Sequence, residues 1–236
     1  YHMHKDKQFF FTGLCLYKRG ELLMNQRRSL KELNLLDKFL FDEAMDDPEN
    51  VKTMLDIILS QNTNLKHPPQ TEKEQRTSTD NRQIRLDVYA IDEDDVIYEV
   101  EAQKEKTHNL PKRSRLYQGI IDSKLLPPGV VDFNLLNEVL IVLIMPFDLF
   151  GYGLYRYTFY MRCEEVPELK LDDGATRIFL NTRGKHPELV SSELIELLKY
   201  MEHSTDEVSE ACESKRIQEM HRRVCRIKAS EKTEVK

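Results

Sequence analysis

Two acidic residues and one amide lie on a pair of segments whose side chains alternate in the manner of β-strands. Asp87 lies in the first segment, and Glu101 and Gln103 lie in the second. Residues two apart on a strand point to the same face at a separation of roughly 6.5–7 Å, so Glu101 and Gln103 can contact one ligand together. If the polar faces of the two segments coincide, Asp87 converges with Glu101.

The chemistry that suits this group is metal-assisted phosphodiester hydrolysis. Two carboxylates held close together in a partly buried site repel, and one takes up a proton unless a cation intervenes. Hard oxygen ligands select Mg²⁺ or Mn²⁺ rather than zinc. We expect Asp87 and Glu101 to bind the metal and Gln103 to position the attacking water. The alternative is a solvated hairpin face, as Glu99 illustrates, since it shares that face and needs no ligand.

A β-hairpin is required to position these residues. Residues 84–91 alternate, with both neighbours of Asp87 facing the other way, and alternation resumes over residues 96–103. The acidic residues 92–95 between them indicate a short turn. The three candidate residues are therefore expected on two adjacent antiparallel strands.

The other elements indicate a mixed α/β domain. Ser29, with Glu32 three residues later, has the capping-box pattern of a helix start, and Pro48 suits the first turn of a second helix. Residues 139–145 form a continuous apolar run of the kind buried on both faces of a central sheet. We expect further strands at 154–161 and 177–180, an edge strand within the loop 62–83, and helices at 30–45, 113–126, 188–201 and 206–227.

The two hairpin segments, IRLDVYA and VIYEVEAQ, resemble the motif region of the PD-(D/E)XK nuclease family transposases. This is the Rpn (recombination-promoting nuclease) group of bacterial mobile-element proteins. The resemblance implies a restriction-endonuclease-like core, in which a central mixed β-sheet is flanked by helices and the active site lies on adjacent strands. It extends over roughly residues 29–204, through further blocks at 33–50, 113–118, 140–150 and 171–182.

The resemblance implies a Mg²⁺-dependent DNA endonuclease. Asp87 matches the family's metal-binding aspartate, and Glu101 matches the acidic residue of its E-x-Q strand. Gln103 stands where the wider superfamily has lysine; its amide lacks that charge but can still hydrogen-bond a water or a phosphate oxygen. The adjacent Lys104 replaces it only if a β-bulge intervenes. Glu49 matches a position where many members carry an acid, although the helix dipole also favours an acid there.

DNA is the expected partner. Arg113, Arg115 and Tyr117, on the helix after the hairpin, are candidates for contact with the phosphate backbone. A solvated helix face explains the two arginines as well. Cleavage of both strands would require two active sites and hence suggests a homodimer. The alternative function is a catalytically weak or inactive DNA-binding or protein-interaction domain that retains the nuclease fold.

Composition limits the class of protein. The 236 residues include 41 acidic and 35 basic side chains, which gives a net charge of −6. This argues against a protein that coats DNA non-specifically, because such binding rests on many unopposed basic residues. It leaves open an enzyme with a local basic groove and a local acidic metal site.

Cysteine spacing and hydropathy bear on location. The four cysteines lie far apart without a C-x-x-C pair, which argues against a disulfide framework or a structural zinc site and favours the cytoplasm. The longest apolar run falls far short of the roughly 18–20 residues of a membrane span. We expect an N-terminal extension or expression-derived segment over residues 1–28, the nuclease-like domain over 29–204, and a basic C-terminal helical tail over 205–236.

Overall fold

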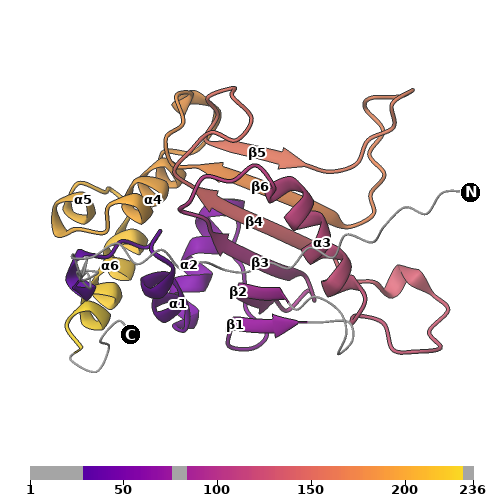
Figure 1. Cartoon of the computed structure of the whole chain (residues 1–236), viewed down its shortest axis with the longest axis horizontal. Coiled ribbons are helices and arrows are strands. Elements are labelled where there is room, and N and C mark those ends of the chain that lie inside the picture. The colour runs from indigo at the N-terminus through magenta and orange to yellow at the C-terminus, as the bar shows by residue number, and fades with distance from the viewer. Residues whose placement is uncertain (1–28, 76–83, 231–236) are drawn as a thin grey trace, which may run out of the picture.

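A six-stranded mixed sheet organises the computed structural model, which describes residues 29–75 and 84–230 (Figure 1). The strand order is β1-β2-β3-β4-β6-β5. β2 runs antiparallel to both β1 and β3, the strands β3, β4 and β6 are parallel, and β5 runs antiparallel to β6. The strands are β1 (Gln70–Gln75), β2 (Ile84–Ile91), β3 (Ile97–Ala102), β4 (Val139–Met145), β5 (Arg156–Phe159) and β6 (Ala175–Asn181).

Helices cover both faces of this sheet, which confirms an α/β fold with a mixed sheet flanked by helices. The α-helices are α1 (Lys38–Met45), α2 (Pro48–Leu59), α3 (Leu110–Asp122), α4 (Ser192–Glu202), α5 (Asp206–Glu210) and α6 (Lys215–Lys228). Short 3-10 helices also form within the described residues: η1 (Leu30–Glu32), η2 (Phe133–Leu135) and η3 (Pro187–Leu189).

Two hydrophobic clusters form the core, one on each face. The first joins α1, α2, α4 and α6 to one side of the sheet, and the second joins α3 to the other side. The central strand β4 contributes to both, because Val142 and Ile144 face the first cluster while Ile141 and Leu143 face the second. The continuous apolar run of residues 139–145 is therefore buried on both faces, as expected.

The single helix expected over residues 30–45 is wrong. The chain forms the short η1, breaks, and then forms α1. In the break, the Leu35 amide donates to Ser204 Oγ at 2.9 Å, and the Leu36 amide donates to the Met201 carbonyl at 3.0 Å. These tertiary hydrogen bonds satisfy donors that a helix would use internally. Ser29 still caps a helix, but the helix is η1.

The C-terminal part also differs from a single long helix over residues 206–227. It forms α5 and α6, because the Glu213 and Ser214 amides bond to the Glu196 carboxylate and the Ser214 hydroxyl caps α6. Similarly, Ser191 caps α4, so the helix expected at residues 188–201 begins later. The helix expected at 113–126 begins and ends earlier, as α3, and the expected edge strand is β1.

The last helix shares the core of the first ones. Ile217, Met220 and Val224 of α6 belong to the same cluster as α1 and α2. Arg223 Nε donates to Asn50 Oδ1 at 2.7 Å, which ties α6 to α2. Residues 1–28, expected to form an N-terminal extension or expression-derived segment, lie outside the described residues, as do the final residues 231–236.

Candidate active site

The strands β2 and β3 part at Asp87 and Glu101. Their registered pairing ends at Val88–Val100, and the next pair in register would join Asp87 to Glu101. Beyond this point β2 is paired with β1 alone, whereas β3 continues beside β4. The two predicted metal ligands therefore stand opposite each other at a fork in the sheet, which we call the β2–β3 fork.

The backbone of β2 is irregular at the same place. β1 has registered pairs on either side of Asp87 but none with Asp87 itself. The residue opposite it, Glu72, has a φ of 49°, a left-handed conformation that costs a non-glycine residue roughly 1–2 kcal/mol. Leu86 and Val88, which flank Asp87, pack into different core clusters. The regular alternation expected over residues 84–91 is therefore interrupted at Asp87.

Three acidic side chains of the hairpin are buried. Asp87 is 6% exposed, Glu99 is 0% exposed and Glu101 is 8% exposed. Tyr98 and Val100 belong to the first core cluster, which confirms that Glu99 and Glu101 face the opposite side, toward α3. A solvated hairpin face does not describe these three acids.

A lysine of α1 reaches Asp87. Lys38 Nζ lies 2.5 Å from Asp87 Oδ1 and 3.1 Å from Asp42 Oδ2, one helical turn away from Lys38. Burial works to lower the pKa of Lys38, but the hydrogen bond and charge of Asp87 and the charge of Asp42 raise it overall. Lys38 therefore stays a cation between two carboxylates.

An arginine of α3 bridges Glu101 and Gln103. Arg113 Nη2 donates to Glu101 Oε1 and, at 2.5 Å, to Gln103 Oε1. The Gln103 amide nitrogen donates to the Glu105 carbonyl at 2.6 Å, so both ends of that side chain are held. Asp87 and Glu101 thus each have a cation from a helix on one or the other face of the sheet.

The carboxyl groups outnumber these cations. Four carboxyl groups lie near two cations, so the group would carry a charge of −2 if every member were ionised. The acids are Asp42, Asp87, Glu99 and Glu101, and the cations are Lys38 and Arg113. The pKa of Glu101 is raised to about 7, mainly by burial. The positive charge of Arg113 lowers this pKa, and the negative charge of Asp87 raises it further. Burial also raises the pKa of Asp42 to about 6, against the effect of Lys38.

Glu99 is the most strongly perturbed acid of the group. Burial raises its pKa well above the ordinary value, and the charges of Glu101 and Asp87 raise it further, while Arg113 lowers it. Neither of its carboxylate oxygens has a hydrogen-bond partner among the described residues. A carboxyl group in this environment is stable as the protonated acid or beside an added cation.

The donor set fits a hard divalent cation. Glu101 Oε2, like both oxygens of Glu99, is buried without a hydrogen-bond partner among the described residues. The remaining nearby acceptors are the carboxylate of Asp87 and the amide oxygen of Gln103. Oxygen ligands with an excess of negative charge are those that Mg²⁺ and Mn²⁺ prefer. Asp87 and Glu101 are the residues that would bind the ion.

The other predicted site residues do not belong to the β2–β3 fork itself. Glu49 is exposed in the first turn of α2, where the helix dipole favours an acid, and the acid next to the fork is Asp42 of α1. Arg115 is exposed on α3. Tyr117 is buried in the second core cluster, and burial together with the charge of Glu101 raises its pKa.

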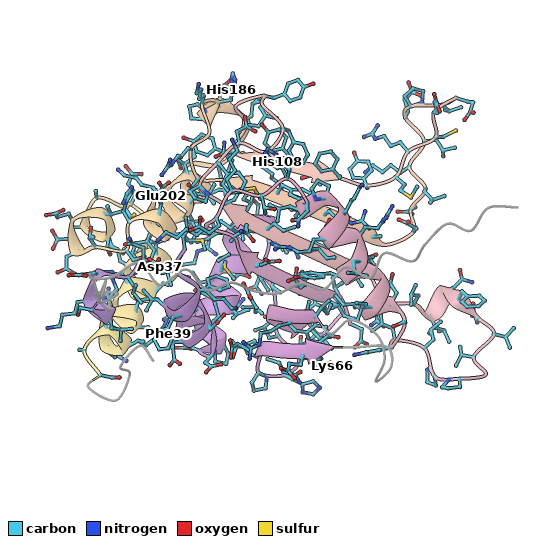
Figure 2. The ribbon with its side chains drawn as sticks, viewed as in Figure 1. Asp37, Phe39, Lys66, His108, His186 and Glu202 are labelled. Atoms are coloured by element: carbon cyan, nitrogen blue, oxygen red, sulfur yellow. The ribbon has the colours of Figure 1, made fainter. Side chains whose placement is uncertain are left out.

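Lys104 does not replace Gln103. Its ammonium pairs with Asp37 at the start of α1, which Figure 2 labels among the helices on the left of the view. The lysine next to the candidate metal ligands is Lys38. A lysine four residues before an aspartate on a helix looks like a surface ion pair, so the sequence alone gave little reason to choose it.

Within the part of the chain that the structure describes, no helix has the length and hydrophobicity to cross a membrane. Comparison with family models, with curated proteins and with solved structures gives no match for this chain.

Proposed function

We propose that this chain is a Mg²⁺-dependent DNA endonuclease of the PD-(D/E)XK type, with a restriction-endonuclease-like core. The observation that carries the proposal is the β2–β3 fork, at which Asp87 and Glu101 occupy opposite positions of the strand register. Beside them lies the buried Glu99, whose carboxylate oxygens have no hydrogen-bond partner among the described residues. A cluster of like charges adds little to the stability of a fold, and a bound divalent cation would offset the repulsion between the carboxylates.

A bound Mg²⁺ or Mn²⁺ would polarise the scissile phosphate and lower the pKa of a water molecule. Asp87 and Glu101 would hold the ion, and the Gln103 amide would hydrogen-bond the attacking water or a phosphate oxygen. The attacking water would lose a proton to solvent as its oxygen bonds to phosphorus, the bond from phosphorus to the leaving ester oxygen would break, and that oxygen would take up a proton from solvent.

Lys38 supplies the positive charge that Gln103 lacks. Its ammonium lies 2.5 Å from Asp87 and is half-exposed, so it can leave the carboxylate and approach a phosphate oxygen. The superfamily lysine would come from β3; here the cation comes from α1, on the other side of Asp87. The role of Lys38 is to stabilise the negative charge that develops on the phosphate.

Exposed cations on α3 extend this site toward the DNA backbone. Lys112 and Arg115 flank Arg113 in sequence and are exposed. Contacts of this kind position the duplex without reading its sequence. Cleavage of both strands would require two such sites, and we propose a homodimer on DNA, which analytical ultracentrifugation with and without a duplex would test.

The direct test is nicking of supercoiled plasmid in the presence of Mg²⁺ or Mn²⁺. Asp87→Asn and Glu101→Gln should each lower the nicking rate by at least about 10²-fold, a typical loss for removal of one group that stabilises the transition state. Glu93→Gln, which removes an exposed acid from the turn of the same hairpin, is the matched control and should keep the rate. Nicking that survives both active-site changes would contradict the proposal.

A second function is a DNA-binding or protein-interaction domain that has lost turnover. Its support is that Asp87 and Glu101 are already paired with Lys38 and Arg113. Calorimetric titration with Mn²⁺ separates the two functions. An enzyme site should bind the ion and lose it in Glu101→Gln, whereas no binding together with no nicking would favour the inactive domain.

A further inference from the structure

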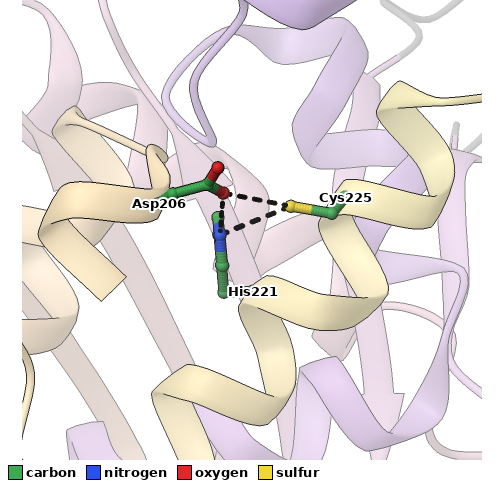
Figure 3. Close-up of side chains that lie close together, drawn as sticks. All are labelled: Asp206, His221 and Cys225. Carbon is green, nitrogen blue, oxygen red and sulfur yellow. Dashed lines mark hydrogen bonds and ion pairs between the residues drawn. The ribbon is translucent and has the colours of Figure 1, made fainter. Parts of the chain in front are cut away.

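A second group of metal-ligating side chains lies far from the β2–β3 fork in sequence, at the start of α5 and along α6. Asp206, His221 and Cys225 bring one ligand atom each to within 4.8 Å of the others (Figure 3). His221 and Cys225 are four residues apart on α6 and therefore share a face of that helix. Asp206 reaches the same point from the first turn of α5.

The three ligand atoms lie close enough together to reach one ion. His221 Nε2 lies 2.8 Å from Asp206 Oδ1 and 3.4 Å from Cys225 Sγ, and the sulfur lies 3.8 Å from Asp206 Oδ1. Zinc bonds of roughly 2.0–2.3 Å to nitrogen, oxygen and sulfur, at tetrahedral angles, separate ligand atoms by about 3.3–3.7 Å. On binding, the separation between Nε2 and Oδ1 would widen by about 0.5 Å. Because Cys225 Sγ also lies 3.8 Å from His221 Nδ1, the Cys225 side chain would change its rotamer to bring the sulfur to the Nε2 side of the ring.

The same geometry excludes a catalytic triad. In a triad the acid and the nucleophile bind opposite nitrogens of the histidine. Here Asp206 Oδ1 lies 2.8 Å from Nε2 and the Tyr200 hydroxyl lies 3.0 Å from Nδ1, whereas Cys225 Sγ lies 3.4 Å from Nε2 and 3.8 Å from Nδ1. Both ring nitrogens already have a closer oxygen partner, so the thiol is not paired with the histidine as an activated nucleophile would be.

A buried tyrosine contacts the second nitrogen of the His221 ring. Tyr200 is 0% exposed and lies in the core, and its hydroxyl contacts the nitrogen that the ligand set leaves over. A partner on the second nitrogen fixes the tautomer and orientation of a metal-binding histidine. Asp206, by contrast, has a side chain that is 82% exposed, which gives an ion a path from solvent.

We propose that Asp206, His221 and Cys225 form a Zn²⁺ site that joins α5 to α6. A cavity of about 370 Å³, lined in part by Asp206, His221 and Glu210, adjoins the cluster and leaves the fourth coordination position to water or an external ligand. Soft sulfur and imidazole nitrogen distinguish this site from the all-oxygen site at the β2–β3 fork, so the two select different ions. The zinc site does not depend on the nuclease proposal.

Cobalt provides the test, because Co²⁺ bound to a thiolate gives a charge-transfer absorption band that oxygen ligands do not give. The full chain, stripped with a chelator, should show this band with Co²⁺, and Zn²⁺ should abolish it by displacement. Cys225→Ser should lose the band, whereas Cys163→Ser, which removes a partly exposed cysteine elsewhere, should keep it. Asp87→Asn should also keep it, which separates this site from the fork.

The affinity for Zn²⁺ provides a second test of the site. By calorimetry, Zn²⁺ should bind at least about tenfold more weakly to Asp206→Asn than to the unchanged chain, since loss of even one supporting group of a metal site commonly costs 10–100-fold. Asp206 is exposed, so this variant keeps the core and folds even if His221→Gln does not. A chain without the cobalt band, or a band that survives Cys225→Ser, would overturn the site.

Discussion

Asp87 and Glu101 occupy the two positions at which β2 and β3 cease to pair. Each carboxylate contacts a cation from a different helix, Lys38 of α1 and Arg113 of α3. The two helices lie on opposite faces of the sheet, so Asp87 and Glu101 connect the helical layer on one face with the helical layer on the other. Substitutions there should change ligand binding more than folding.

Divalent cations should stabilise the protein through this pair. At a Mg²⁺ concentration ten times its Kd, mass action adds about 1.4 kcal/mol to the free energy of unfolding. For a chain of this size, that raises Tm by about 3–6 °C. Differential scanning fluorimetry should show the rise in the unchanged chain and in Glu93→Gln, but not in Glu101→Gln. An equal rise in all three would place the bound ion elsewhere.

Lys38→Met should lower the nicking rate by about 10²–10³-fold, because it removes the only cation proposed to act on the phosphate from the α1 side. Lys38→Arg should keep part of the rate. The matched control is Lys31→Met, on the exposed face of η1. The single-turnover rate at saturating DNA is the measurement, since it separates charge stabilisation from binding. Equal losses in both methionine variants would point to general DNA affinity instead.

Glu99→Leu should make the protein more stable. The side chain is 0% exposed, and its two oxygens have no hydrogen-bond partner among the described residues. Replacing an unsatisfied buried polar group with an apolar one of similar size removes a cost of about 1–3 kcal/mol. Urea unfolding without divalent cation should show the gain, and Glu93→Leu, at an exposed site, should stay within about 0.5 kcal/mol. Destabilisation by Glu99→Leu would mean that Glu99 has a favourable partner.

Asp148 should contribute stability that is lost in acid. Partial burial works to raise its pKa, but the Tyr157 hydroxyl at 2.7 Å and the amides of Gly153, Gly151 and Phe150 hold the pKa below its ordinary value. A depressed carboxyl pKa stabilises the fold above the unfolded pKa of about 3.9, and this contribution disappears as pH falls through the folded pKa.

Asp148→Asn should therefore lower the free energy of unfolding by about 1 kcal/mol at pH 7, a value reduced for solvent screening at this partly exposed site. The difference from the unchanged chain should close below about pH 4. Urea titrations at several pH values would measure it. Glu168→Gln, at an exposed acid of the β5–β6 connection, should give no such pH-dependent gap.

The hairpin and the common face of Glu99 and Glu101 could be predicted from sequence because both depend on local alternation. Glu99 and Glu101 fall on one face wherever β3 is paired, so their common orientation follows from the period of two. The interruption at Asp87 could not be predicted in this way. It lies opposite Glu72, a residue of another strand with a left-handed conformation.

The contacts of the two cations, Arg113 and Lys38, could not be predicted from the sequence either. Arg113 was proposed to contact DNA, but the structure turns it inward to Glu101 and Gln103. Lys38 lies 49 residues before Asp87, and only the packing of α1 beside β2 brings them together. His221 and Cys225 did carry a readable signal, a spacing of four on a strongly amphipathic helix, which a search for zinc-finger spacing passes over.

The hydrogen bonds between the break after η1 and the end of α4 have a consequence for biosynthesis. Leu35 and Ser204 are 169 residues apart, and Asn50 and Arg223 are 173 apart. α1 therefore cannot dock fully while the ribosome still holds the C-terminal helices, and Lys38 cannot take its place beside Asp87. Lys38 should thus reach Asp87 only after α6 has left the ribosome, which protease protection of stalled ribosome complexes of increasing length would follow.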